Sequence, residues 1–216
     1  MVPNRAVLSM YRRRNPFVAH EGVAPLALVA ALGIVIILYA NPWLALIPAI
    51  LFVYLFLVFR DPRRPVPAAA LGVVSPVDGE VVAVEKTEAC FLPGETYRIR
   101  IRINSFGTYT ARSPVEGTVM DLRADAPENV DCPSNALWIK TDEGDDIVLQ
   151  FHGYRFGIAP HSFVGFGQRI GQGHRCAYLR LAKYADVFMP VTGKVIVAPG
   201  DEVLAGSGLL GSVQRQ

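Results

Sequence analysis

Charged residues are scarce in this chain and unevenly placed. Asp, Glu, Lys and Arg make up 19% of its 216 residues, while 51% are hydrophobic; a typical soluble domain carries about 25% charge. This composition excludes an intrinsically disordered chain, because disorder requires low hydrophobicity and high charge. The net charge of +2 is too small to indicate a nucleic-acid-binding protein.

Cysteine is also scarce. Cys90, Cys132 and Cys176 lie far apart, and none belongs to a CxxC pair, so the sequence predicts neither a disulfide framework nor a thiolate zinc site. Histidine spacing in the second half of the chain matches no metal-binding signature either; these residues are His152, His161 and His174. We therefore expect no metal site.

One long segment has no charge at all. Residues 23–40 and 43–59 are two apolar runs separated by the turn-favouring dipeptide Asn41-Pro42. Each run is long enough for a transmembrane helix, which needs about 17–25 residues. The pattern predicts a transmembrane helical hairpin, spanning or re-entrant. A signal peptide is disfavoured by the second apolar run, and a buried hairpin of a soluble protein is disfavoured by the length of both runs.

Arginine is concentrated on both flanks of these runs. An excess of positive charge marks the cytoplasmic side of a membrane segment, so both flanks are expected there. We therefore expect residues 1–64 to anchor the chain in the inner or plasma membrane and residues 65–216 to form a cytoplasmic domain. The flanking arginines are Arg5, Arg12, Arg13 and Arg14 before the runs and Arg60, Arg63 and Arg64 after them.

The remainder of the chain has the pattern of β structure. Short Val- and Ile-rich segments alternate with Gly and Pro, and Arg98–Ile103 (RIRIRI) alternates in polarity like a half-buried strand. We expect a mostly β domain of roughly eight to twelve strands, with a short helix near residues 153–160. The predicted strands cover residues 79–84, 97–103, 117–122, 136–140, 146–151, 176–181, 185–189 and 194–197.

The pattern P-V-x-G-x-V occurs three times, in Ser75–Val81, Ser113–Val119 and Met189–Val195. Proline starts a strand without needing a backbone donor, glycine permits close backbone approach, and the valines are expected in a core. Repeats of this kind are typical of barrel-sandwich β modules. The predicted fold is a mostly β, barrel-sandwich-like domain preceded by a transmembrane helical hairpin.

Two consecutive segments carry a resemblance to a known family. Phe59–Pro67 (FRDPRRPVP) and Val73–Val81 (VVSPVDGEV) resemble the motifs FRDPxRxxP and SPxDGxV of the short, membrane-anchored type of phosphatidylserine decarboxylase proenzyme. Phe106–Gly117 (FGTYTARSPVEG) resembles that family's FDVHxNRxPxxG motif. Weaker matches follow in the family's order, so the resemblance covers nearly the whole chain; they lie in residues 128–137, 165–173 and 183–203.

The resemblance implies an unusual cofactor. Members of this family cut themselves at a Gly-Ser bond and convert the new chain end to a pyruvoyl group. That group forms a Schiff base with the lipid amine and accepts electrons as CO₂ leaves. Carried over by motif, Asp78 is a catalytic residue, and Arg112 and Ser113 lie where substrate is bound.

The sequence departs from the family at the residues that make this cofactor. Tyr109 stands at the family's His position, and Ala182-Lys183 stands where the Gly-Ser pair is expected. Lysine cannot be converted to a pyruvoyl group, so we expect no cofactor unless an unrecognised cleavage site is used. Gly211-Ser212 is one candidate, but cleavage there would release only residues 212–216; Gly206-Ser207 matches the family less well.

Three functional hypotheses follow. The first is a decarboxylase-like protein that cannot process itself and binds phospholipid headgroups or a membrane partner, including a second copy of itself. The second is an active decarboxylase making phosphatidylethanolamine. The third is a β scaffold in a membrane assembly. Neither the acidic residues 142–146 nor the Gly-rich residues 165–173 match a calcium or nucleotide motif, so both are interpreted as turns.

Overall fold

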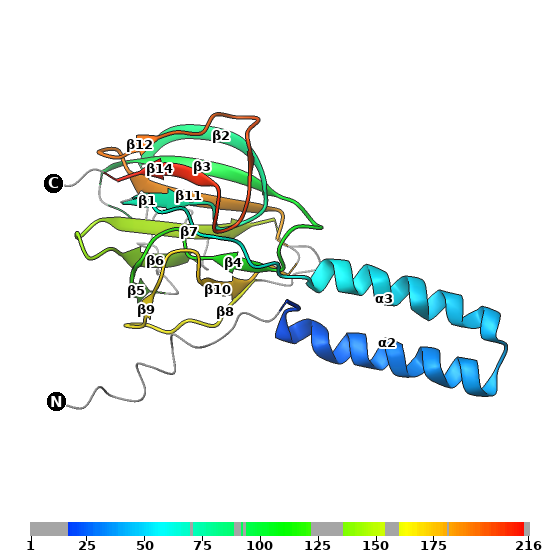
Figure 1. Ribbon diagram of the computed structural model, residues 1–216. Coiled ribbons are helices and arrows are strands. Elements are labelled where there is room, and N and C mark those ends of the chain that lie inside the picture. The colour runs from blue at the N-terminus through cyan, green and yellow to red at the C-terminus, as the bar shows by residue number, and fades with distance from the viewer. Residues whose placement is uncertain are drawn as a thin grey trace, which may run out of the picture. The chain divides into compact units, whose positions relative to one another are not determined.

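The computed structural model describes residues 17–69, 71–88, 92, 94–121, 136–153, 160–180 and 182–213. The chain divides into two compact units, Met1–Arg63 and Arg64–Gln216. The mostly β fold with an N-terminal pair of apolar helices is confirmed, at 39% strand and 22% helix (Figure 1).

The first unit is a helical hairpin. Helix α2 (His20–Tyr39) is followed by the 3-10 helix η1 (Pro42–Ala45) and by α3 (Leu46–Phe59), and the Asn41 side chain caps the turn by accepting from the Trp43 N–H at 3.1 Å. The stretches His20–Tyr39 and Pro42–Phe59 are long and apolar enough to cross a membrane. Most of their apolar side chains are exposed, unlike those of a buried soluble hairpin, which supports a membrane anchor.

The two helices approach closely where α2 begins and α3 ends. A Cβ added to Gly22 would lie 2.4 Å from the Phe59 Cβ, so only glycine fits there. The Ala19 N–H donates to the Phe59 carbonyl at 2.9 Å, and the Asp61 N–H donates to the Phe17 carbonyl at 2.7 Å. These bonds bring the chain into and out of the hairpin at the same end.

The second unit contains one eight-stranded antiparallel sheet, in the order β13-β2-β3-β11-β7-β6-β5-β9, and two three-stranded sheets, β1-β14-β12 and β4-β10-β8 (Figure 1). The strands are β1 (Gly72–Val74), β2 (Gly79–Glu88), β3 (Glu95–Ile103), β4 (Thr110–Arg112), β5 (Gly117–Asp121), β6 (Ala136–Lys140), β7 (Asp146–His152), β8 (His161–Ser162), β9 (Arg169–Ile170), β10 (Arg175–Tyr178), β11 (Tyr184–Pro190), β12 (Lys194–Val195), β13 (Glu202–Val203) and β14 (Leu209–Ser212).

All eight predicted strands are present. The described residues hold fourteen strands, more than the eight to twelve expected, because six further strands are two to four residues long and too short to show a period. The helix expected near residues 153–160 falls mostly on residues 154–159, outside the described part of the chain.

The large sheet has the same strand arrangement when followed from either end. β2, β3 and β11 on one side correspond to β5, β6 and β7 on the other. At the centre, Val187 pairs with Leu149, and these residues are 38 positions apart, the same separation as between the first two sequence repeats. The sheet therefore has an approximate two-fold axis between β11 and β7.

The first two sequence repeats occupy equivalent places about this axis. A Cβ added to Gly79 would lie 2.1 Å from the Arg102 carbonyl oxygen, and one added to Gly117 would lie 2.2 Å from the Lys140 carbonyl oxygen. Only glycine allows this approach. The third copy, Met189–Val195, does not correspond to them: it runs from the end of β11 through a turn into β12.

The two faces of the large sheet differ in chemistry. Alternate residues of β3, β7 and β11 enter the main core, including Ile99, Leu149 and Val187, which are fully buried. The intervening positions of β3 carry Arg98 and Arg100, each of which forms an ion pair. The buried apolar face thus sets the register of these strands. The register in turn sets where the strands end, next to the residues of the sequence motifs.

Candidate functional site

Asp78, the acid among the predicted site residues, has a hydrogen-bonded carboxylate. It lies in the turn of the first repeat, 4% exposed, and forms a bidentate ion pair with Arg64, with Arg64 Nη2 2.9 Å from Oδ2. The N–H of Thr108 donates to Oδ2 at 3.0 Å, and that of Ala205 donates to Oδ1 at 2.7 Å. A carboxylate offers about four acceptor positions, so these bonds occupy all of them.

Sequence reasoning missed Arg64 as a functional residue. Its signal was available, because Arg64 is the second arginine of the FRDPxRxxP motif. The guanidinium matches a carboxylate in a planar, two-bond geometry. Arg64 therefore fixes the orientation of the Asp78 carboxylate.

Backbone hydrogen bonds place residue 183 near Asp78. The Asn104 N–H donates to the Asp78 carbonyl, and the neighbouring Ile103 N–H donates to the Lys183 carbonyl, both at 2.8 Å. The two residues therefore lie at the same end of β2, β3 and β11. Lys183 itself is exposed, and its own N–H donates to the His152 carbonyl at 3.1 Å.

Tyr109 is joined to the same region by a short chain of backbone contacts. The Leu179 N–H donates to the Tyr109 carbonyl at 3.0 Å, and the Ala182 N–H donates to the Leu179 carbonyl at 3.1 Å. The Tyr109 ring packs 5.9 Å from that of Tyr178. An imidazole changes its charge near neutral pH and a phenol ordinarily does not; that Tyr109 stands at the family's histidine position stays a prediction from the motif.

Arg112 and Ser113 are buried in the turn of the second repeat. Arg112 Nη1 donates to the Gly173 carbonyl at 3.2 Å, and Ser113 Oγ donates to the Val115 carbonyl at 2.7 Å. Ser75 makes the same bond to the Val77 carbonyl in the first repeat. The serine is thus part of the repeat's turn, and its role toward a substrate stays a prediction.

Cys176 lies beside these residues as a free, fully buried cysteine. Burial raises the pKa of its thiol to about 12, against the opposing effect of the Arg112 charge. The thiolate is the reactive form of cysteine, so burial and a raised pKa disfavour Cys176 as a substitute nucleophile.

The alternative Gly-Ser bonds are part of the framework. Gly211-Ser212 lies in β14, the middle strand of its sheet, where Ser212 pairs with both Gly72 and Lys194. Cleavage at this bond would cut that strand. Gly206, in the other pair, is held by its N–H, which donates to the Ser75 carbonyl at 2.7 Å.

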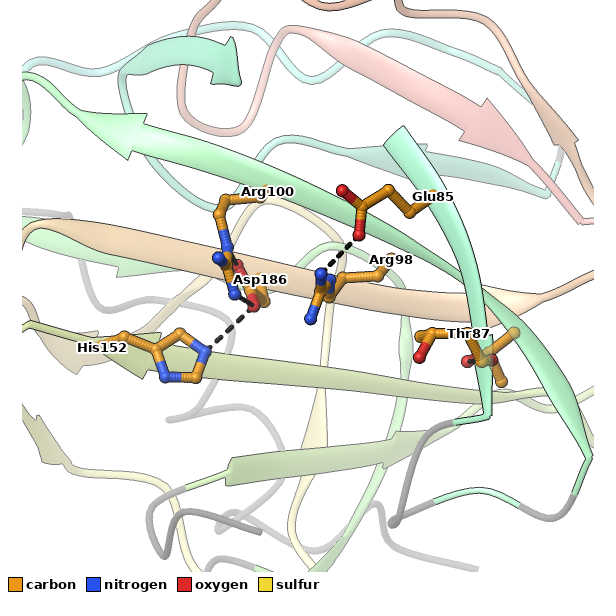
Figure 2. Close-up of polar contacts among 7 residues, drawn as sticks. Glu85, Thr87, Arg98, Arg100, His152 and Asp186 are labelled. Atoms are coloured by element: carbon orange, nitrogen blue, oxygen red, sulfur yellow. Dashed lines mark hydrogen bonds and ion pairs between the residues drawn. The ribbon is translucent and has the colours of Figure 1, made fainter. Parts of the chain in front are cut away.

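A polar cluster on β3, β7 and β11 was also missed (Figure 2). Asp186, 1% exposed, accepts from Arg100 Nε at 2.9 Å and Nη2 at 2.8 Å, and its Oδ2 lies 3.0 Å from His152 Nε2. Burial raises the pKa of Asp186, but the bonds from Arg100 and His152 outweigh it and hold the pKa below the ordinary value. The signal was a single acid within the apolar strand Ala185–Met189.

Comparison with known proteins identifies the family. The chain is 35% identical over 210 residues to a phosphatidylserine decarboxylase proenzyme of Nitrosomonas europaea, covering 91% of this chain and 95% of that protein. The chain belongs to the phosphatidylserine decarboxylase proenzyme family. The proenzymes of Nitrosomonas eutropha and Aromatoleum aromaticum are 34% and 30% identical, each with 91% of this chain and 95% of the relative covered.

Other comparisons add little. No family model matches the chain. Among solved structures, the glucose permease IIA from Mycoplasma capricolum has a TM-score of 0.45 at 20% identity, covering 65% of this chain and 94% of that chain, a similarity too weak to argue from.

The residues that the motif comparison predicts at the proenzyme cleavage position, Ala182 and Lys183, do not have the chemistry to form a pyruvoyl group. In this family that group forms from a serine, whereas residues 182 and 183 carry a methyl group and a butylammonium chain. Residues 128–135, part of the segment that resembles a family motif, lie outside the described residues.

Proposed function

We propose that this protein is a membrane-anchored member of the phosphatidylserine decarboxylase family that does not convert itself to a pyruvoyl enzyme and binds a phospholipid headgroup without covalent chemistry. The names of its relatives support this lipid class. The observation that carries the proposal is the side chain of residue 183, an exposed lysine at the start of β11.

The chemistry of self-cleavage requires a hydroxyl at this position. In the family, the serine oxygen attacks the preceding carbonyl and an ester forms. β-Elimination then breaks the Cβ–O bond, releases the upstream chain as a carboxylate and leaves a dehydroalanine, which water converts to the pyruvoyl group with loss of ammonia. Lysine has no oxygen on its Cβ, so no ester forms and nothing is eliminated. The state of Asp78 supports the same reading, because Arg64, Thr108 and Ala205 occupy its acceptor positions.

A lysine at this position favours a different contact with a phospholipid. The family's electrophile reacts with the headgroup amine, but an ammonium group repels an amine that is itself protonated. It attracts phosphate or carboxylate oxygens through charge-assisted hydrogen bonds. Lys183 is therefore proposed to contact the anionic part of the headgroup.

The membrane arrangement is part of the proposal. We propose that residues 1–64 anchor the chain and that residues 65–216 face the cytoplasm. The arginines on both flanks favour this orientation. The hydrogen bonds from Ala19 to Phe59 and from Asp61 to Phe17 support it, because they place both ends of the hairpin together.

The test uses the full chain in mild detergent and short-chain phosphatidylserine as the ligand. Calorimetric titration is expected to show saturable binding, and Lys183→Gln is expected to weaken it about threefold or more, as for loss of a charge-assisted bond. Lys194→Gln, which removes another exposed lysine, in β12, is the control and is expected to bind normally.

Two results would overturn the proposal. Release of phosphatidylethanolamine together with a chain split in two would establish the active decarboxylase instead. Absence of lipid binding, with a membrane protein co-purifying only while residues 17–63 are present, would establish the scaffold alternative.

A further inference from the structure

The two-fold arrangement of the sheet builds the Asp78 region twice. Glu116 takes the place of Asp78 in the second repeat. Asp145 takes the place of Lys183: the Ile103 N–H donates to the Lys183 carbonyl and the Thr141 N–H donates to the Asp145 carbonyl, both at 2.8 Å. The counterpart region thus has its own acid and its own residue at the start of a central strand.

A cavity of about 200 Å³ lies in this counterpart region. Its lining combines apolar and acidic side chains, which suits a small ligand with a carbon body and one charged end. The residues that matter here are Leu71, Val115, Glu116, Asp142, Glu143 and Asp145. At the Asp78 end, the matching acid is instead bonded to the guanidinium of Arg64.

Two of the four acids share one cation, Arg169. Arg169 Nη2 donates to Glu116 at 3.1 Å and also to Asp142. The remaining two are Glu143, which is exposed, and Asp145, which is only 8% exposed. One arginine against four carboxylates leaves the cavity with a net negative charge.

Asp145 is the unexplained group. Its backbone is bonded to Thr141 at both the N–H and the carbonyl, but within the described residues its carboxylate has no hydrogen-bond or ion-pair partner. A buried charge without a partner is costly. Burial, together with Glu143 and Asp146, accordingly raises the pKa of Asp145.

We propose that this cavity binds a small organic cation that donates N–H bonds, a guanidinium or primary ammonium group, with Asp145 as its acceptor and Glu143 at the entrance. The Arg64–Asp78 ion pair shows that the equivalent region of this fold holds a guanidinium against a carboxylate; at Glu116, the counterpart of Asp78, Arg169 takes that role and leaves Asp145 as the available acceptor. A metal ion fits less well, because the described residues contain no group of three or more His, Cys, Asp or Glu placed to hold one. The site is separate from residue 183, so it does not depend on the proposed function.

The experiment titrates methylguanidinium and ethylammonium, each as the chloride, into the full chain in mild detergent at constant ionic strength. Thermal stability is the readout, because a ligand that binds only the folded state raises the melting temperature with its concentration. Tetramethylammonium is the control cation, since it carries the same charge and no N–H. Saturable stabilisation by at least one N–H cation, and none by tetramethylammonium, is expected.

Matched variants locate the effect. Asp145→Asn is expected to weaken binding at least about tenfold, as for loss of a buried charge partner, and Glu143→Gln to weaken it less. Glu202→Gln removes an exposed acid from β13, outside the cavity, and is expected to change nothing. Equal stabilisation by tetramethylammonium, no saturable stabilisation by either N–H cation, or unchanged binding in Asp145→Asn would overturn the proposal.

Discussion

The Asp78 end of the large sheet and its Glu116 counterpart share one backbone frame and differ in what fills it. Asp78 is buried and bonded to Arg64 and two backbone N–H groups. The Glu116 side chain is 54% exposed and forms an ion pair with Arg169, which is itself exposed. The repeat therefore sets the backbone position of each acid. The neighbouring side chains determine its role: Asp78 is bonded within the fold, whereas Glu116 lines a cavity.

The largest expected difference between the two ends is in stability. Asp78→Ala removes the partner of Arg64 and the acceptor of two buried N–H groups, and is expected to lower the free energy of unfolding by about 3–5 kcal/mol. Glu116→Ala breaks an exposed ion pair and should cost at most about 1 kcal/mol. Denaturant unfolding of the full chain measures both losses. Equal losses would contradict the view that the bonds of buried Asp78 stabilise the fold more than the exposed ion pair of Glu116 does.

The repeat glycines test the symmetry itself. Gly79→Ala and Gly117→Ala each place a methyl group 2.1–2.2 Å from a carbonyl oxygen, so each should cost about 3 kcal/mol through overpacking. Gly165→Ala, where an added Cβ meets nothing within 4 Å, is the control. A loss at only one of the two repeat positions would show that the ends are not equivalent.

The Asp186 cluster is expected to contribute an acid-sensitive part of the stability. Its folded-state pKa is lowered, so its contribution is complete above the ordinary aspartate pKa of about 3.9 and is lost as the pH falls through the folded-state value. Asp186→Asn should lower stability at pH 7 by about 2 kcal/mol and remove that part of the acid dependence. If the variant and the parent chain lose stability in parallel below pH 4, the Asp186 cluster is not the source of the acid dependence.

Asp145 should show the opposite sign with a smaller effect. Because its folded-state pKa is raised, the ionised group opposes folding, and the parent chain should lose stability as the pH rises from about 4 through the folded-state value. Asp145→Asn should remove this loss and gain less than about 1 kcal/mol at pH 7 without ligand. Thermal unfolding between pH 4 and 7 measures it, and a destabilised variant would mean that the carboxylate already has a partner.

The sequence predicted most of the fold because its signals were local. The uncharged run from residue 23 to residue 59 predicted the helical hairpin, and alternation in residues 97–103 predicted β3. Strands such as β8, β9 and β13 have two residues each, and their pairing comes from tertiary contacts that no local pattern shows.

The site was predicted less completely, because it depends on contacts between residues far apart in the sequence. Asp78 and Lys183 could be found by motif, but the ion pair between Arg64 and Asp78 joins residues whose contact no motif specifies. The correspondence of β11 with β7 has little trace in sequence, since YADVFMP and DIVLQFH share almost nothing beyond apolar character. Only their places in the sheet reveal it.

The most direct test of the proposed function is the intact mass of the full chain after expression and purification. A single polypeptide near 23.6 kDa, with Ala182 still joined to Lys183, is the predicted result. Two polypeptides, the second starting with a pyruvoyl group at any position, would contradict it.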